Sequence, residues 1–313
     1  MKIMKMNKYI SQASAIALLV GALVSVSCSN ISRNADSEIS DRQLTIIATH
    51  DNGTKTSLIS GSGVKSVVWS PQDAISLFYE SGDKGGSCFV TEDSGPVAQF
   101  TGTITSISGN LEEDSFSSLF WGLYPYETSA SCDGTSIHTN LIVNQKGVPD
   151  TFADRTAVAV GRSNTLKISF KNANAIFAFK LERDDIRKIK MYGNNDEKIA
   201  GSFTITFDSN GNVISTPKTD ASTYVCVTPA QGSTFLPDTW YYIVTLPVIF
   251  SDGYSIEFET WSEIGIYSTS EERNFEISTF YTLTEKDNDA VFTPKDTSLE
   301  NPEGADDPEI PWI

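Results

Sequence analysis

The chain has few of the residues on which most enzyme chemistry depends. Its 313 residues include only two histidines, His50 and His138, which we place at the surface or at a strand edge. A zinc site or a hydrolase usually needs more imidazole. No phosphate-binding, dinucleotide-binding or nucleophile-elbow motif occurs. The sequence therefore predicts a protein that is not an enzyme and uses no cofactor or metal.

Positive charge is also scarce, with 23 basic against 40 acidic residues and a net charge of −17. Removal of residues 1–27, which hold three lysines and no acid, would make the net charge −20. Phosphate backbones repel so acidic a chain, and we exclude nucleic acid as a partner. No segment after residue 30 is long and apolar enough to span a bilayer, which takes ~20 residues.

The N-terminus reads as an export signal. Three lysines precede an apolar run over residues 15–26, which is too short for a spanning helix. The run ends in Ser25-Val26-Ser27-Cys28, which resembles the bacterial lipobox, although leucine is usual where Ser25 stands. We predict that residues 1–27 are a signal peptide and that lipid on Cys28 holds the protein at the cell outer membrane. An ordinary secreted protein is the alternative.

Three cysteines remain after the signal peptide, namely Cys88, Cys132 and Cys226. Their long spacings match no metal-ligand pattern. We interpret them as half-buried small apolar residues, and one disulfide in an oxidising compartment stays open.

The rest of the chain is organised as short extended segments. Residues 28–42 are polar and predict a tether. Beyond them, runs of β-branched and aromatic residues with a period of two predict strands. These runs cover residues 44–48, 64–69, 75–79, 97–104, 119–124, 166–170, 175–181, 203–207, 224–227, 240–246, 254–261 and 275–283. Turn signals separate many of them, at Asn52-Gly53, Asp133-Gly134, Asn210-Gly211 and Asp252-Gly253.

Strands this dense predict an all-β fold of two tandem antiparallel β-sandwich domains, over residues 43–164 and 165–286. Residues 287–313 form an acidic tail with eight acidic residues and one lysine. Its end, Glu309-Ile310-Pro311-Trp312-Ile313, is apolar for a solvated tail, as is the Val291-Phe292 pair. A disordered tail and a strand-forming tail both stay open.

Two weaker patterns suggest binding or catalysis. Glu257 and Glu259 lie on one strand face, ~6.5 to 7 Å apart, which suits glycoside hydrolysis. The alternation of Ile256 and Phe258 favours an ordinary wet strand face instead. Trp121 and its aromatic neighbours Tyr124 and Tyr126 could stack on sugars or fill the core.

Four motifs follow one another along residues 44–285. They are the Trp-x-x-x-Asp-x-Ile pattern of Trp69, Asp73 and Ile75; residues 98–102; residues 123–126 with Gln145 after them; and residues 168–179. In their order and spacing they resemble the fimbrillin family, the type V pilins of bacterial surfaces.

The resemblance implies two transthyretin-like sandwiches and assembly by strand exchange. A trypsin-like protease removes the first strand of such a precursor, and a strand of the next subunit fills the groove. The removable strand here would be residues 44–49. The matching basic residue is Lys55, where the family usually has arginine, and a cut after Arg42 would free only the tether. The donor strand would lie around Val291 and Phe292, or around Ile310 and Trp312, although Pro308 and Pro311 weaken the second choice.

We therefore expect a structural or accessory subunit of a type V-like pilus, or fimbria, serving cell adhesion. Its partners would be other pilus subunits, the outer membrane through the lipid, and a host receptor or glycan. The alternative is a surface glycan-binding lipoprotein that serves a polysaccharide importer.

Overall fold

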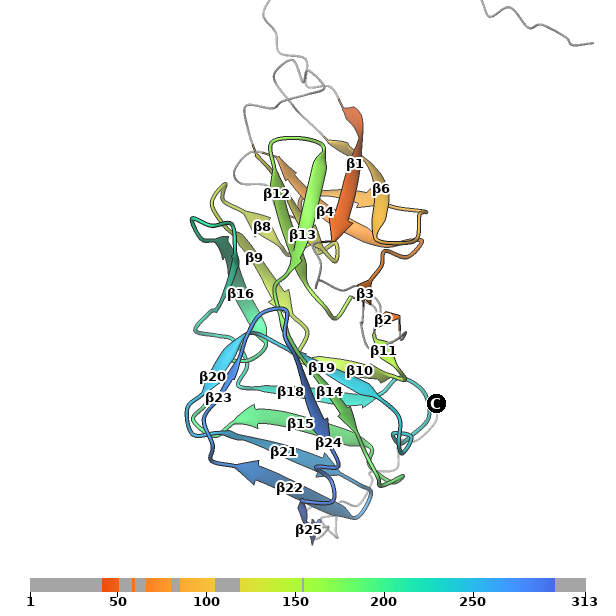
Figure 1. The fold of residues 1–313 in the computed structure, drawn as a ribbon, viewed down its shortest axis with the longest axis vertical. Coiled ribbons are helices and arrows are strands. Elements are labelled where there is room, and N and C mark those ends of the chain that lie inside the picture. Colours follow the sequence, from red (N-terminus) through yellow and green to blue (C-terminus); the bar gives the residue numbers. More distant parts are fainter. Residues whose placement is uncertain are drawn as a thin grey trace, which may run out of the picture. The chain divides into compact units, whose positions relative to one another are not determined.

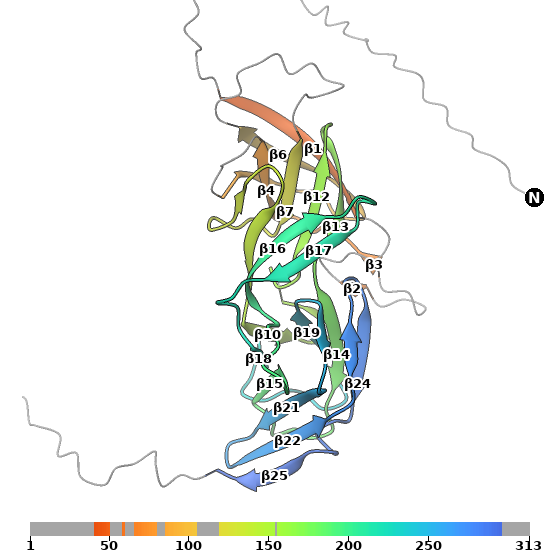
Figure 2. The same cartoon turned by 90° about the vertical axis from the view of Figure 1, so that its left-hand side faces the viewer.

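The described part of the chain is built from β-strands. The computed structural model describes residues 41–50, 58–59, 66–79, 85–104, 119–153 and 155–295, and its regular elements in these ranges are strands (Figures 1 and 2). Within them the structure contains no helix of the length and apolar character that a membrane crossing requires. The all-β class predicted from the sequence is confirmed.

The first strands form a closed barrel in the order β1-β13-β12-β7-β4-β5-β6. Its strands are β1 (Arg42–His50), β4 (Ala74–Tyr79), β5 (Ser87–Val90), β6 (Val97–Ile104), β7 (Phe120–Tyr124), β12 (Ala159–Ser163) and β13 (Lys167–Asn172). A short hairpin joins β2 (Leu58–Ile59) to β3 (Ser66–Val67). Closure gives β1 a neighbour on each side, β6 and β13.

A second group of strands packs as a sandwich. A seven-stranded sheet has the order β11-β10-β18-β15-β21-β22-β25, and a three-stranded sheet has the order β19-β14-β24. The larger sheet contains β10 (Asn144–Val148), β11 (Thr151–Phe152), β15 (Lys188–Gly193), β18 (Tyr224–Pro229), β21 (Tyr254–Glu259), β22 (Glu263–Thr269) and β25 (Val291–Pro294). The smaller contains β14 (Ala175–Lys180), β19 (Tyr241–Thr245) and β24 (Phe280–Thr284).

Two further sheets complete the described structure. One has the order β17-β16-β9-β8, and the other pairs β20 with β23. Their strands are β8 (Ser131–Cys132), β9 (Ile137–Leu141), β16 (Gly201–Phe207), β17 (Val213–Pro217), β20 (Val248–Phe250) and β23 (Arg273–Phe275). The turn glycines Gly134, Gly211 and Gly253 have positive φ, which confirms three of the four turn signals. The Asn52-Gly53 signal lies outside the described residues.

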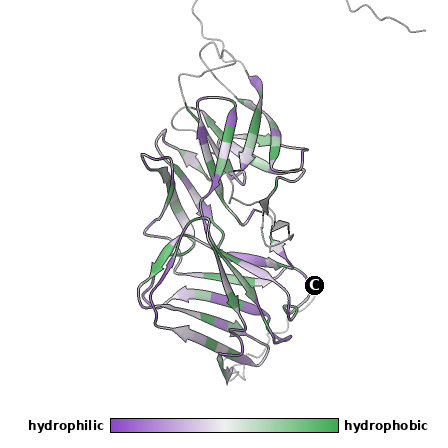
Figure 3. Cartoon of the chain, viewed as in Figure 1, coloured by the Kyte–Doolittle hydropathy of each residue, from purple (hydrophilic) through white to green (hydrophobic). Residues whose placement is uncertain are grey.

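Alternation of side chains explains where these strands bury their faces. In β6, Ala98, Phe100 and Ile104 are buried while Gln99 and Thr101 are exposed. The same alternation of hydrophobic and hydrophilic residues is visible along several strands in Figure 3. Successive side chains of a strand point to opposite faces, so this pattern fixes which face packs inward. It produces one apolar core inside the barrel and a second core that the remaining sheets share with side chains of the barrel strands β4, β7 and β12.

The sheets do not follow the division that we expected at residue 164. Strands β8 to β11, before that point, pair with strands of the later part, as in β9 with β16 and β10 with β18. Strand β13, after that point, belongs to the barrel and pairs with β1. Backbone pairing between distant segments decides this arrangement, and local sequence pattern does not carry that information.

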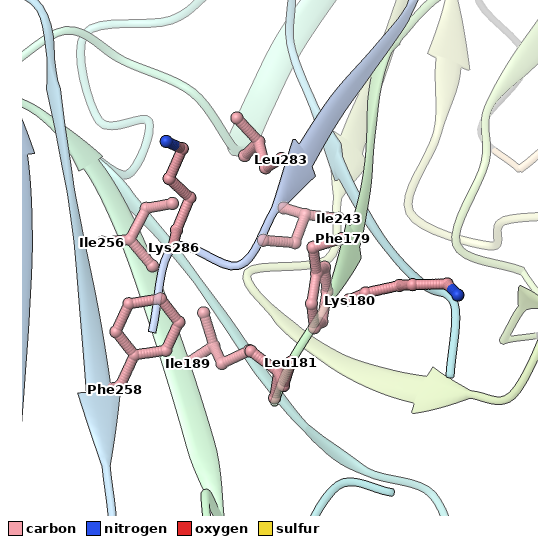
Figure 4. Close-up of a pocket in the computed structure, with 9 residues that line it drawn as sticks. All are labelled: Phe179, Lys180, Leu181, Ile189, Ile243, Ile256, Phe258, Leu283 and Lys286. Atoms are coloured by element: carbon pink, nitrogen blue, oxygen red, sulfur yellow. The ribbon is translucent and has the colours of Figure 1, made fainter. Parts of the chain in front are cut away.

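The sandwich core contains one small void, shown in Figure 4. Ile256 and Phe258 of the larger sheet face Phe179, Ile243 and Leu283 of the smaller one across it. Its volume of about 10 Å³ is that of a single water at most. Because the lining is almost wholly apolar, we assign this void to packing and not to a ligand.

The side chain of Gln145 supplies hydrogen bonds to the edge of β19 that does not face β14. Its amide Nε2 donates to the carbonyl oxygen of Val244 at 2.7 Å, and its Oε1 accepts from the Val244 amide at 3.0 Å. The side chain is 2% exposed, so water does not compete for these bonds. A glutamine on β10 thus replaces a neighbouring strand at Val244.

We expect Gln145→Leu to lower the free energy of unfolding by about 2–4 kcal/mol, because it leaves the buried N–H and C=O of Val244 unpaired. Urea unfolding measures this loss. The matched control is Asn144→Leu at the exposed neighbouring position on β10, which should change stability by less than ~0.5 kcal/mol. Equal effects of the two substitutions would show that the hydrogen bonds of the Gln145 amide do not add to the free energy of unfolding.

Candidate strand-exchange site

Strand β1 is held on both edges inside the barrel. Eight of its residues pair antiparallel with β6, from Arg42↔Ile104 to Thr49↔Val97. Four pair parallel with β13, from Ile47↔Lys167 to His50↔Phe170. The last third of β1 therefore has strand neighbours on both sides, and its first third pairs with β6.

The side chains of β1 alternate as the sequence predicts. Leu44 is 8% exposed, and Ile46 and Ala48 are fully buried, while Thr45 between them is exposed. Burial of a side chain the size of Leu or Ile contributes ~1.5–3 kcal/mol each. Net backbone hydrogen bonds add ~0.5–1.5 kcal/mol apiece. The strand is thus a substantial part of the stability of the barrel.

The surface that β1 covers is strongly apolar. Ala98 and Phe100 on β6 and Ile168 and Phe170 on β13 belong to the same buried cluster as Ile46. Removal of β1 would uncover these side chains and free the facing backbone edges of β6 and β13. An extended segment with alternate apolar residues is what such a groove accepts.

His50 ends β1 and differs from what we expected. Its ring stacks on Trp69 with centroids 4.0 Å apart, and both ring nitrogens are buried without a hydrogen-bond partner among the described residues. The indole nitrogen of Trp69 is likewise buried without a hydrogen-bond partner among the described residues. Burial lowers the pKa of His50 from 6.5 to about 3. We predicted that His50 lies at the surface or at a strand edge. Its ring nitrogens are buried, so the surface position is wrong for them, although His50 does end a strand.

Trp69 and Asp73 of the recognised motif hold neighbouring segments together. Trp69 is fully buried and meets Phe100 and Phe170 edge-on. The Asp73 carboxylate accepts from the amide of Ser70 at 2.8 Å, which closes a turn before β4. Its other oxygen accepts from the hydroxyl of Tyr124 at 3.0 Å. The motif thus ties the entry to β4 to the end of β7.

The predicted processing and anchoring residues are only partly covered by the structure. Cys28, Lys55, Ile310 and Trp312 lie outside the described residues, as do the signal peptide and nearly all of the tether and the last part of the tail. Arg42 is described, and it is exposed as the first residue of β1 opposite Ile104. A cut after Arg42 would accordingly leave β1 in place.

The nearer donor candidates, Val291 and Phe292, already belong to β25. This strand pairs antiparallel with β22, with Phe292 opposite Gly265. The Arg183 guanidinium lies 4.0 Å above the Phe292 ring, while Val291 is 72% exposed. Just before β25, buried Asp287 accepts from the amides of Glu182 and Arg183 at 2.8 and 2.9 Å. In this state the segment serves its own sheet.

The carboxylate pair on β21 forms structural ion pairs. Glu259 accepts from Lys295 at 2.9 Å and lies 3.4 Å from Lys188. Burial raises the pKa of Glu259, but the hydrogen bonds and positive charges of Lys295 and Lys188 together outweigh burial and lower the pKa. A general acid of a glycosidase needs a raised pKa, so this arrangement does not favour that chemistry.

The remaining sequence candidates take structural positions. Trp121 is 2% exposed and packs on Phe207, so its face is not available to a sugar. Of the three described cysteines, Cys132 and Cys226 are buried and Cys88 is exposed, and no disulfide joins any two of them. Within the described ranges no cluster of His, Cys, Asp and Glu is arranged to hold a metal ion.

Comparison with known proteins gives remote structural likenesses. No family model and no curated protein matches the chain. A solved "putative cell adhesion protein" from Bacteroides uniformis aligns at 14% identity and a TM-score of 0.48, over 81% of this chain and 96% of that one. A second such protein, from Bacteroides ovatus, aligns at 11% identity and 0.46, over 82% and 96% of the two chains.

A fimbrial protein from Bacteroides ovatus aligns at 13% identity and 0.33, over 77% of this chain and 48% of that one. These descriptions agree with the fimbrillin resemblance of the sequence. At TM-scores below 0.5 they carry no argument by themselves, and the fold rests on the strand pairing described above.

Proposed function

We propose that the protein is a surface lipoprotein, anchored through Cys28, that serves as a structural or accessory subunit of a type V-like pilus. It adheres and assembles, and it catalyses no reaction. Subunits join by strand exchange, in which the groove under β1 of one subunit receives an extended segment of the next. Its location is the cell outer membrane, or the pilus after processing.

The observation that carries this proposal is the placement of β1. It is a single N-terminal strand with alternate buried side chains between two neighbours. The predicted cut after Lys55 falls beyond the end of β1, so cleavage there would detach the strand from the rest of the covalent chain. A replacement strand restores both the backbone bonds and the apolar burial, which makes exchange favourable.

The donor strand in this assembly is the segment around Ile310 and Trp312, in preference to β25. Use of Val291 and Phe292 would deprive β22 of one of its two neighbouring strands and Arg183 of the ring beneath it. Ile310 and Trp312 alternate, so both side chains of an extended segment would enter the groove on one face.

The N-terminal residue of the protein taken from the cell surface tests this function. We expect Thr56 for a processed subunit and Cys28 for an uncut anchor. Brief trypsin treatment of purified precursor should then give a truncated core that forms ladders resistant to mild denaturant, and Lys55→Ala should prevent them. A trimmed core that stays monomeric would overturn strand exchange.

A further inference from the structure

An open groove lies beside β24, where the smaller sheet of the sandwich ends. It has a volume of about 490 Å³, within the range of ~300–1,000 Å³ typical of small-ligand sites. Tyr281, Thr282 and Leu283 of β24 form one wall. Tyr254 and Tyr267, on the inward faces of β21 and β22, form another.

Four aromatic rings are fixed in this groove. Phe275 meets Tyr281 edge-on at 4.5 Å between ring centroids and lies 5.8 Å from Tyr254, while Tyr254 and Tyr267 are 6.2 Å apart. The Tyr281 hydroxyl donates to the Asn274 carbonyl and accepts from the Glu276 amide, both at 3.0 Å. These contacts hold the rings in place before any ligand arrives.

The rim of the groove is polar and carries acidic and basic side chains. Glu272, Arg273 and Asn274 line it from β23 and the turn before it, and all three side chains are exposed. Arg273 is paired with Glu271. Donors and acceptors are thus available around an aromatic interior.

Lys286 separates this groove from the packed core. Its side chain also lines the core void, where Figure 4 shows it passing beside Ile256 with the ammonium group directed away from Phe258. The ammonium lies 4.7 Å from the Tyr267 ring and 3.0 Å from an oxygen of Asp289. The apolar stem closes the sandwich, and the charged end remains at the groove.

We propose that this groove binds a pyranose sugar. A pyranose has an apolar face of C–H groups and an edge of hydroxyls. The half-buried rings of Tyr267 and Tyr281, which Tyr254 and Phe275 support from behind, complement the first, and the mixed polar rim complements the second. An extended peptide is the other occupant to consider, but it would satisfy its backbone along β24 and would make less use of charged side chains on the opposite rim. This inference is independent of strand exchange at β1.

Saturation-transfer NMR on the full chain, with methyl pyranosides of glucose, galactose, mannose, N-acetylglucosamine and galacturonic acid, tests the proposal. We expect at least one to bind, with affinity at least tenfold weaker in Tyr267→Ala. Tyr224→Ala removes an exposed tyrosine on the outer face of β18 and should leave binding unchanged. Near-ultraviolet circular dichroism checks that the variants fold.

Arg273→Trp supplies a second test that removes no core contact, since Arg273 is exposed, lines the groove and shares the face of β23 that carries Phe275. It should abolish pyranoside binding while the thermal melting temperature is retained. Binding of none of the five sugars, or equal binding by the Arg273→Trp variant, would overturn the proposal. Binding of a synthetic peptide of residues 305–313 in the groove, with no sugar bound, would overturn it in favour of a peptide site.

Discussion

A disulfide between β1 and β6 is expected to stop assembly without stopping cleavage. Thr45 and Thr101 are directly opposite and both are exposed, so Thr45→Cys with Thr101→Cys places two thiols outside the barrel. Opposite residues of antiparallel strands have Cα atoms ~4.5–5.5 Å apart, which a disulfide accommodates. After a cut at Lys55, the oxidised variant keeps β1 covalently attached, and the groove stays filled.

The expected contrast is large because assembly needs the groove empty. Oxidised protein treated with trypsin should remain monomeric, and addition of dithiothreitol should restore ladders to the level of the uncrosslinked chain. A Cys88→Ser background avoids mispairing with the exposed native thiol. Thr45→Cys alone is the matched control and should assemble with or without reductant. Ladders from the oxidised double variant would show that β1 does not occupy the acceptor groove.

Acid is expected to destabilise the barrel through His50. The folded pKa of about 3 lies below the ordinary value of 6.5, so the unfolded chain binds the proton more tightly than the folded one. The stabilising contribution of neutral His50 is complete above pH 6.5 and is lost progressively as pH falls toward 3. At ~1.4 kcal/mol per pH unit, the loss reaches about 3 kcal/mol at pH 4.

His50→Phe separates this effect from the titration of carboxylates. The substitution keeps an aromatic ring against Trp69 and removes two buried nitrogens for which the described part of the chain supplies no hydrogen-bond partner. We expect urea unfolding at pH 7, 5.5 and 4 to show that the free energy of unfolding of the variant, relative to that of the natural protein, rises by about 3 kcal/mol from pH 7 to pH 4. Thr45→Val, an exposed change on the same strand, should give a constant difference. A constant difference for His50→Phe would contradict the buried neutral imidazole.

The strands that sequence reasoning found are those with apolar side chains at every second position. Residues 97–104 were expected as a strand and form β6 with those bounds. Strand β10 was missed because its buried positions are Gln145 and Gly147, which give no hydrophobic signal. Strand β15 was missed although Ile189 and Met191 alternate with lysines, a signal that was available.

The partners of these strands could not be read from the sequence. Strand β1 pairs in parallel with β13, some 120 residues further along, and nothing local in either segment specifies the other. Likewise, His50 follows an exposed-looking pattern next to Asp51-Asn52-Gly53, but the position of Trp69 decides its burial. The processing residue Lys55 rests on the family resemblance, and no contact in the described structure bears on it.

The crossing of the chain between the barrel and the other sheets limits how such a gene can be rearranged. Strands β8 to β11 leave the barrel, β12 and β13 return to it, and β14 departs again. A single recombination event at the middle of the coding sequence would separate both β1 from β13 and β10 from β18. Either half alone therefore lacks strands that its sheets need, and exchange of one half would leave both the barrel and the larger sheet incomplete.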